Sequence, residues 1–253
     1  MPAGVKERVR CVINSRNRLN PLTETSDNFT VTLNSSLTRI ADIEIERVEI
    51  PYSFYTINSS NNVLTFNSGA NSITITPGNY TANNLITEMK TQLNVTFAGQ
   101  NPNVTFSPIT YKLTITKTAA FTVDSSSSVP TSTASYVLGF RVSSASSTSV
   151  TADSVLNISG PNYILISSKY LTNGIYHKTL FSNASYQSVF WAVPVNCSPG
   201  STIIESPSMP IHLNSKVSLS PADVIDFQLT DDTNNPISLN GLDWAMQMIF
   251  IIE

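Results

Sequence analysis

One stretch of this chain, residues 77–93, is the only long segment with the spacing of an amphipathic helix, and this scarcity constrains the fold most. Its apolar residues would share one side of a 3.6-residue helix; they are Leu85, Ile86, Met89 and Leu93. Thr81 is the expected N-cap, because its hydroxyl can accept from free N–H groups of the first turn, and Pro77-Gly78 supplies the preceding break. The rest of the chain has the pattern of strands and turns. We therefore predict one capped helix set among β-strands.

Alternating apolar and polar residues predict strands in both end regions of the chain. The predicted strands are 9–13 and 29–33, around a polar turn at Asn20-Pro21, then 40–55, 155–158, 163–167, 189–195, 203–204, 211–219, 225–229 and 246–252. Segments 211–219 and 225–229 have the clearest hairpin pattern. Segment 246–252 is almost entirely apolar, which predicts a strand covered on both faces, either central in a sheet or buried by a partner.

Segment 40–55 changes its parity part way along. Ile43 and Ile45 fall on one parity, whereas Val48 and Ile50 fall on the other. A β-bulge near Arg47 would turn all four apolar side chains inward. The same strand carries three glutamates, Glu44, Glu46 and Glu49, which could suggest the acid pair of a hydrolase. We expect them to lie on a solvated face beside Arg47.

The middle of the chain has a different pattern of predicted secondary structure. A hairpin is predicted from 63–66 to 73–76 around Asn67-Ser68-Gly69, followed by the helix and by strands at 104–106 and 111–116. Serine runs at 125–128 and 143–149 are expected to form exposed, mobile loops. We therefore predict an N-terminal arm at 1–9, a main β domain from 10–55 and 155–253, and a small α+β insertion at 56–154.

Charge is scarce in these 253 residues. Only 12% are charged and the net charge is −3, which gives no electrostatic basis for gripping a phosphate backbone, so no direct nucleic-acid ligand is expected. A polar, nearly neutral surface suits contact with neighbouring subunits, since few ions need desolvating. There is no apolar run of the signal-peptide type and no uncharged segment of membrane-spanning length, so the chain is expected neither to be secreted nor to span a membrane by its own sequence.

The sequence offers no catalytic, cofactor-binding or metal-binding residues that we would assign. Its two histidines, His177 and His212, are expected on the surface, and no Cys/His spacing resembles a zinc site. Glycine-rich nucleotide-binding motifs are absent from the sequence. Segment 231–235 offers oxygens for calcium, but its residue types are those of a turn. Cys11 and Cys197 could form one disulfide, although two reduced thiols are the favoured reading.

The order of several motifs resembles the penton, or minor capsid, proteins of virophages, polinton-like viruses and related eukaryotic double-stranded DNA viruses. These motifs are Gly78-x-Tyr80-Thr81 with its helix, Tyr136-Val137-Leu138-Gly139-Phe140, and the ending 211–250 with Asp223, Gly241, Asp243 and Trp244. The resemblance runs from about residue 10 onward. It implies an all-β fold with a single jelly-roll β-sandwich, into which the small α+β subdomain with its helix is inserted.

The resemblance also implies a function. It implies a structural protein with no enzymatic activity or cofactor, which forms the five-fold vertex of an icosahedral virion as a homopentamer. Trimers of a double jelly-roll major capsid protein would surround it, and a host receptor or fibre is a further partner that the resemblance leaves open. We hypothesise that strands within 28–55 and 188–230 form the walls between subunits, and that 56–150 faces outward.

Two other function classes remain open at this point. A receptor- or carbohydrate-binding β-sandwich, such as a viral fibre head, would need Trp191 or Trp244 on the surface to stack on sugar. A hydrolase on a β-sandwich would need buried, converging carboxylates, for which Asp223 and Asp226 are the candidates.

Overall fold

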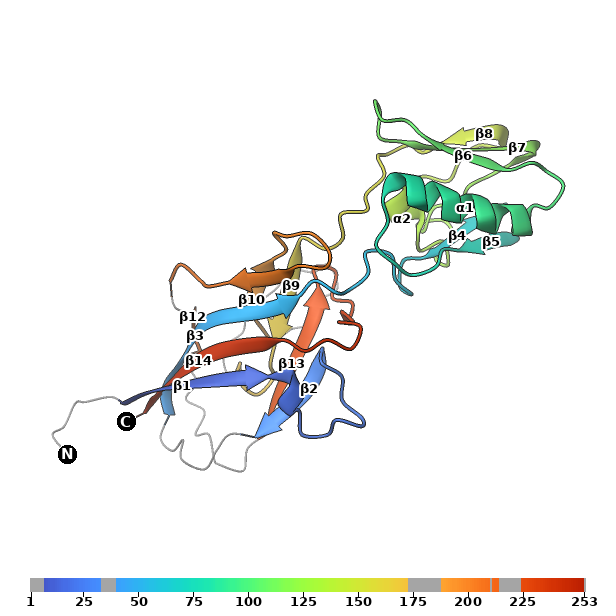
Figure 1. Cartoon of the computed structure of the whole chain (residues 1–253). Coiled ribbons are helices and arrows are strands. Elements are labelled where there is room, and N and C mark those ends of the chain that lie inside the picture. Colours follow the sequence, from blue (N-terminus) through green and yellow to red (C-terminus); the bar gives the residue numbers. More distant parts are fainter. Residues whose placement is uncertain (1–6, 33–39, 173–187, 210, 214–223, 253) are drawn as a thin grey trace. The chain divides into compact units, whose positions relative to one another are not determined.

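A computed structural model describes residues 7–32, 40–172, 188–209, 211–213 and 224–252 of the chain (Figure 1). The chain divides into two compact units, one made of Met1–Phe54 with Pro161–Glu253 and the other of Tyr55–Gly160. We call the first the sandwich unit and the second the insertion unit. Among the described residues, no helix has the length and hydrophobicity needed to cross a membrane.

Two antiparallel sheets build the sandwich unit. The first sheet has the strand order β1 (Glu7–Asn14), β14 (Ala245–Ile252), β3 (Ile40–Pro51) and β11 (Thr202–Glu205), and β12 (Ile211–His212) also pairs with β3. The second sheet has the order β10 (Val189–Pro194), β9 (Tyr163–Ser167), β13 (Val224–Asp231) and β2 (Asn28–Thr32). Strands that follow one another in sequence therefore often lie in different sheets, as β1, β2 and β3 do. This strand order agrees with the predicted jelly roll.

The last strand, β14, lies in the centre of the first sheet, between β1 and β3. The prediction of a central strand is confirmed. Met246, Met248 and Phe250 are fully buried on its inner face. Coverage on both faces was predicted, but the outer face is only partly covered, because Gln247 and Ile249 remain half-buried there.

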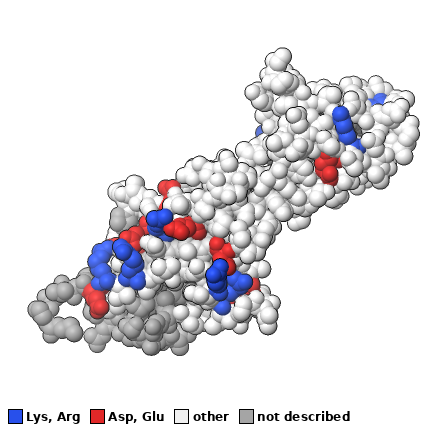
Figure 2. All heavy atoms as spheres, viewed as in Figure 1, with Lys and Arg blue, Asp and Glu red and all other residues white. Residues whose placement is uncertain are grey.

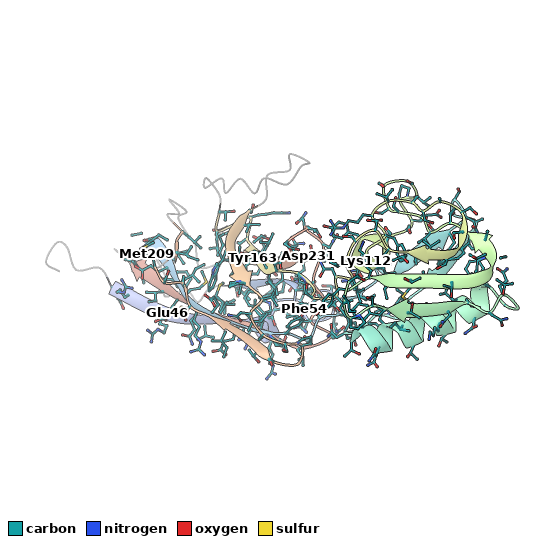
Figure 3. The ribbon with its side chains drawn as sticks, turned by 90° about the horizontal axis from the view of Figure 1, so that it is seen from above. Glu46, Phe54, Lys112, Tyr163, Met209 and Asp231 are labelled. Carbon is teal, nitrogen blue, oxygen red and sulfur yellow. The ribbon has the colours of Figure 1, made fainter. Side chains whose placement is uncertain are left out.

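The predicted bulge in β3 is confirmed. Arg47 pairs with Gln247 and Ile45 pairs with Met248, so Glu46 is the extra residue between the two pairs. It is labelled in Figure 3. One added residue reverses the parity of a strand. As a result, all four apolar residues on either side of it point inward, with relative exposures of 0 to 1%; they are Ile43, Ile45, Val48 and Ile50.

Aromatic rings from the second sheet and from the residue before β14 meet in the core of the sandwich unit. Phe29 of β2 stacks on Phe227 of β13 with ring centroids 5.6 Å apart. The ring of Trp244, which directly precedes β14, packs edge-on against both, at 5.8 and 6.3 Å. Edge-to-face pairs of this kind add about 0.5–1.5 kcal/mol each beyond the burial of their area. This cluster joins the C-terminal end of the chain to β2 near its beginning.

The insertion unit contains one long helix, two small sheets and a separate core. Strands β4 (Val63–Phe66) and β5 (Asn71–Thr74) form a hairpin, and β6 (Asn103–Phe106), β7 (Leu113–Phe121) and β8 (Ser147–Thr151) form a three-stranded sheet. The hairpin prediction is confirmed, and Asn67, Ser68 and Gly69 of its turn all have positive φ. The buried core includes Leu64, Phe66, Leu85, Met89, Leu93, Leu113 and Phe121.

Helix α1 (Ala82–Thr96) confirms the amphipathic prediction. The Thr81 hydroxyl accepts a hydrogen bond from the Asn84 N–H at 3.3 Å, which caps the first turn. Leu85, Met89 and Leu93 are fully buried against the insertion core. Ile86, predicted on the same side, is only partly buried and packs at the border of that core.

The serine runs differ from the expected exposed loops. Ser126, Ser127 and Ser128 are exposed, but Ser125 is 1% exposed and its hydroxyl contacts the hydroxyls of Ser127 and Ser143. The second run enters strand β8, which the sequence did not predict because Val150 is its one buried residue. The Ser143 and Ser144 hydroxyls accept from the backbone N–H groups of Ser125 and Val123 at 2.9 and 2.8 Å. Neutral hydroxyls here therefore satisfy buried backbone groups, a role that composition alone does not reveal.

Helix α2 (Ser135–Leu138) ends at Gly139, which has a φ of +85°. The Gly139 carbonyl accepts a hydrogen bond from the Ser154 N–H at 2.9 Å. A Cβ added to Gly139 would lie 2.4 Å from the Ser154 carbonyl oxygen, and real Cβ contacts are never this short. Glycine at this position of the Tyr-Val-Leu-Gly-Phe motif is therefore required by both backbone conformation and space.

Three further predictions need correction. Residues 155–158 form no strand, although Leu156 and Ile158 pack partly on the insertion core. Residues 7–9, assigned to an arm, belong to β1. The predicted hairpin of 211–219 with 225–229 is wrong in its described part, because β12 pairs with β3 in the first sheet and β13 lies in the second. Residues 214–223 lie outside the described residues.

Candidate functional site on the outer face of the first sheet

The outer face of the first sheet gathers side chains from four strands in register. Arg10 of β1 lies opposite Ile249 of β14, which lies opposite Glu44 of β3, which in turn lies opposite His212 of β12. Since side chains of directly opposed residues point to the same side of a sheet, these four form one row. A neighbouring row contains Arg8, Ile251 and Asp42.

Arginines of β1 reach across β14 to carboxylates of β3. Arg8 donates two hydrogen bonds to Glu44, and Arg10 donates to Glu46 at 2.6 Å. The apolar stems of such side chains can cover the strand beneath them. Ile251 on β14 is accordingly only 8% exposed although it lies on the outer face. Figure 2 shows paired clusters of Lys or Arg beside Asp or Glu over the sandwich unit.

Glu44 corrects the expectation that the glutamates of β3 are solvated. Its side chain is 9% exposed and is held in a two-bonded contact with Arg8. Glu46 and Glu49 are more open and pair with Arg10 and Arg47. Each of these glutamates therefore has an arginine partner.

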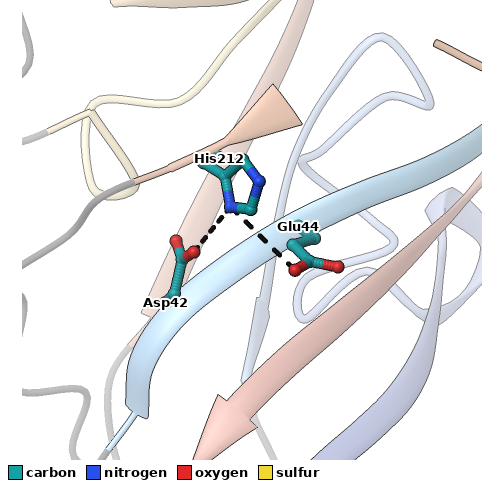
Figure 4. A group of neighbouring side chains, drawn as sticks. All are labelled: Asp42, Glu44 and His212. Atoms are coloured by element: carbon teal, nitrogen blue, oxygen red, sulfur yellow. Dashed lines mark hydrogen bonds and ion pairs between the residues drawn. The ribbon is translucent and has the colours of Figure 1, made fainter. Parts of the chain in front are cut away.

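His212 joins the carboxylates at the far end of the row. Its Nδ1 lies 2.6 Å from Asp42 Oδ2 and 4.0 Å from Glu44 Oε1, and all three groups offer atoms that could bind a cation (Figure 4). The sequence prediction placed His212 on the surface, and its side chain is indeed 46% exposed. The cluster itself was missed, because His212 and Asp42 are 170 residues apart. His177 lies outside the described residues.

A second charged group, at Asp243, holds the two ends of the chain together. Its Oδ1 accepts from the Ser15 hydroxyl at 2.9 Å and from Arg18 Nη1 at 3.0 Å, and its Oδ2 accepts from Arg16 Nε at 3.3 Å. Burial alone would raise the pKa of Asp243, but these hydrogen bonds, together with the positive charge of Arg18, hold that pKa below its usual value. The backbone N–H of Trp244 donates to the hydroxyl oxygen of Ser15 at 3.0 Å. Asp243 and Trp244, two of the residues on which the resemblance to penton proteins rests, therefore connect the segment just before β14 to the segment that follows β1.

The other proposed acidic sites serve as turn and loop anchors. Asp226 accepts from the backbone N–H groups of Lys169 and Tyr170 at 3.0 and 2.9 Å, while Asp223 lies outside the described residues. Asp231 Oδ1 accepts from the N–H groups of Thr233 and Asn235 at 2.9 and 2.7 Å. Asp231 thus forms an Asx turn with its own segment. Asp226 instead anchors the backbone that follows β9, 56 and 57 residues earlier in the chain.

Neither tryptophan offers its face to a ligand. Trp191 is 7% exposed and Trp244 is 2% exposed, and both belong to the sandwich core. The fibre-head reading needed one of them on the surface, so it loses its proposed binding platform. Cys11 and Cys197 are free thiols packed against the same core, and burial raises the pKa of each.

The chain matches one protein family and is similar in structure to solved proteins. Residues 2–229 match the family described as "Family of unknown function (DUF5901)". No curated protein matches the chain. Among solved structures, the crystal structure of the mavirus penton protein is similar at a TM-score of 0.50 and 10% identity, covering 97% of this chain and 99% of that one. A chain in the structure of the Sputnik virophage is similar at a TM-score of 0.46 and 12% identity, with 96% and 97% covered.

The likeness to the mavirus penton protein is one of fold, and it includes the insertion because nearly all of both chains is covered. The predicted resemblance to virophage penton proteins is thus confirmed at the level of the fold. At this identity, the fold by itself does not assign a function.

Proposed function

We propose that this chain, which belongs to the DUF5901 family of unknown function, is a structural capsid protein that resides in a virion and carries out no reaction. One observation carries the proposal: the sandwich with its inserted unit follows the fold of a penton protein along nearly its full length. The outer face of the first sheet supports it, since its carboxylates are paired with arginines and a histidine.

We further propose that the chain forms the five-fold vertex of an icosahedral virus as a homopentamer. A ring of identical subunits closes through heterologous contacts, so each subunit must offer two different side surfaces. Strands within 28–55 and 188–230 are our candidates for these surfaces. They carry exposed apolar side chains such as Ile204, which is 50% exposed on β11, and Val224, which is 41% exposed on β13. Trimers of a double jelly-roll major capsid protein would surround the ring.

Light scattering coupled to gel filtration tests the pentamer, with negative-stain imaging of the same fractions. We expect a mass of five chains and rings with five-fold symmetry. A protein that stays monomeric at high concentration, with no pentamers in purified particles, would contradict the proposal.

A matched pair of variants tests where the walls lie. Ile204→Arg places a charge on the proposed wall, where burying it without a partner is costly, so pentamers should dissociate. Val95→Arg adds the same charge on helix α1 of the insertion unit, where Val95 is 77% exposed, and should leave the ring intact. Equal assembly of both variants would exclude β11 from the wall.

We also propose that the insertion unit faces outward on the particle. Its serine-rich segments contain exposed residues such as Ser126 and Ser127, which a protease can reach. Limited proteolysis of intact particles should cut within 125–128 or 143–149 and spare the N-terminal region. The reverse pattern would place the insertion inside.

A further inference from the structure

Three metal-ligating side chains meet where the edge strand β12 joins β3. Asp42 and Glu44 alternate along β3 and project from the same face, and His212 lies directly opposite Glu44 in the pairing of the two strands. Figure 4 shows the three side chains turned toward one another. One imidazole nitrogen and one oxygen from each carboxylate all lie within 4.8 Å of one another.

The spacing of these atoms suits a single ion. Zinc binds nitrogen and oxygen at about 2.0–2.2 Å, so two of its ligand atoms in a tetrahedral site lie roughly 3.4 Å apart. The separations from His212 Nδ1, 2.6 Å to Asp42 Oδ2 and 4.0 Å to Glu44 Oε1, fall on either side of that value. Shifts of less than about 1 Å would therefore bring each carboxylate oxygen to the ligand–ligand distance from the imidazole nitrogen, and the two carboxylate oxygens lie within 4.8 Å of each other.

Neighbouring groups already orient both carboxylates. The Ile43 N–H donates to Asp42 Oδ1 at 2.8 Å, which leaves Oδ2 directed at His212. Arg8 Nη2 holds Glu44 Oε2, while Oε1 has only a 3.2 Å bond from Arg8 and faces the imidazole. Metal ligands are commonly held by such outer hydrogen bonds, which fix their direction before the ion binds.

The charges of the cluster also favour a cation. Two carboxylates face one arginine, so with a neutral imidazole the group carries one net negative charge. A bound divalent ion would offset this negative charge. Imidazole nitrogen combined with carboxylate oxygen suits zinc and related transition metals, whereas calcium and magnesium prefer oxygen alone.

We propose that Asp42, Glu44 and His212 bind one divalent transition-metal ion of the zinc type, with water completing its coordination. Binding links β12 to β3 through side chains, beside the described backbone pairing of Ile211 with Ile45 and His212 with Glu44 and the hydrogen bond from the Leu213 N–H to the Ile43 carbonyl. The ion therefore adds a side-chain link between β12 and the sheet. This inference concerns the isolated chain and does not depend on the proposed capsid role.

Isothermal titration of the untagged, chelator-treated full chain with zinc chloride tests the proposal. We expect one saturable site per chain, and His212→Ala should weaken it by more than about 100-fold, since the loss of an outer-shell partner alone costs 10–100-fold. His177→Ala is the matched control, because it removes the other histidine of the chain, and it should bind as the unaltered protein does. No saturable binding, or equal binding by His212→Ala, would overturn the proposal.

Thermal unfolding with and without zinc gives a second readout. Zinc should raise the Tm of the unaltered protein and of Glu46→Gln, whose carboxylate lies on the same strand but outside the cluster. It should not raise the Tm of Asp42→Asn, which keeps the shape of the side chain and guards against a folding defect in the histidine variant. Magnesium and calcium should leave every Tm unchanged. A zinc-dependent rise that survives in Asp42→Asn would also count against the site.

Discussion

The two units of this protein stabilise their surfaces with different chemistry. In the part of the chain that the structure describes, the ion pairs lie in the sandwich unit, where arginines and a histidine meet carboxylates. The insertion unit uses neutral partners instead. Its Asp124, 3% exposed, accepts from the N–H groups of Ser68 and Gly69 at 3.1 and 2.8 Å. Lys117 donates to Gln100 at 2.7 Å, and burial lowers the pKa of its amine.

A low overall charge can therefore coexist with a local concentration of charge. Ion pairs on an open surface weaken as salt screens them, whereas hydrogen bonds between neutral groups are much less affected. The two units should therefore respond differently to salt, to pH and to core substitutions.

The largest effects should come from matched core truncations, one in each unit. Phe227→Ala in the sandwich unit and Phe66→Ala in the insertion unit each remove a fully buried ring and should cost about 3–5 kcal/mol. Each loss should stay within its own core, because the two clusters of buried residues are separate. Peptide-resolved hydrogen exchange measures this. If Phe66→Ala loosens β14 as much as α1, the two units do not unfold separately.

A glycine pair within the insertion unit should come next. Gly139→Ala forces a side chain into left-handed backbone and against the Ser154 carbonyl, so a loss of about 2–4 kcal/mol is expected. Gly99→Ala is the control, since Gly99 has a φ of +77° but open space around it, and should cost only about 1 kcal/mol. Urea unfolding gives both values. Equal losses would show that the close approach to Ser154 relaxes.

Asp243→Asn in the sandwich unit should cost about 1.5–3 kcal/mol at neutral pH, because it weakens charged hydrogen bonds to Ser15, Arg16 and Arg18. The folded pKa of Asp243 lies below its unfolded value, so its contribution is complete above about pH 5 and is lost as the pH falls through the folded pKa. The stability difference between the two proteins should therefore shrink only in acid. A difference that is constant across this range would contradict the assigned role of the charge.

The smallest effects should come from two surface glutamates, one in each unit. Glu49→Gln removes an open ion pair with Arg47 and should cost less than about 1 kcal/mol, falling further in high salt. Glu88→Gln in helix α1 loses charged hydrogen bonds from Thr76, which hold the pKa of Glu88 low, and its cost of about 1 kcal/mol should depend little on salt. Chemical unfolding at low and high salt compares them. The same salt dependence in both would remove the proposed distinction.

Local features of the fold could be predicted because nearby residues determine them. Helix α1 and its Thr81 cap follow from spacing and residue type within one segment. The bulge at Glu46 follows from a change of parity that no straight strand can accommodate. The hairpin turn at 67–69 follows in the same way from its Asn-Ser-Gly sequence.

The remaining features depend on contacts between distant segments. His212 was visible as a residue, but its neighbours Asp42 and Glu44 depend on which strand β12 joins, and alternation does not specify that. Glu44 was expected in solvent because no local signal shows that Arg8 would cover it. Strand β8 was missed because its sequence, Ser-Thr-Ser-Val-Thr, carries too little apolar periodicity.

The pairing of β1 with β14 also has a consequence for how the protein is made. Among the described strands of the sandwich unit, Ala245–Ile252 is the last to leave the ribosome, whereas its partner Glu7–Asn14 is the first. Chains fold during synthesis unit by unit, and partners this far apart in sequence meet slowly. The insertion unit can therefore finish folding on the nascent chain while the strands that pair with β1, β2 and β3 have not yet been synthesised.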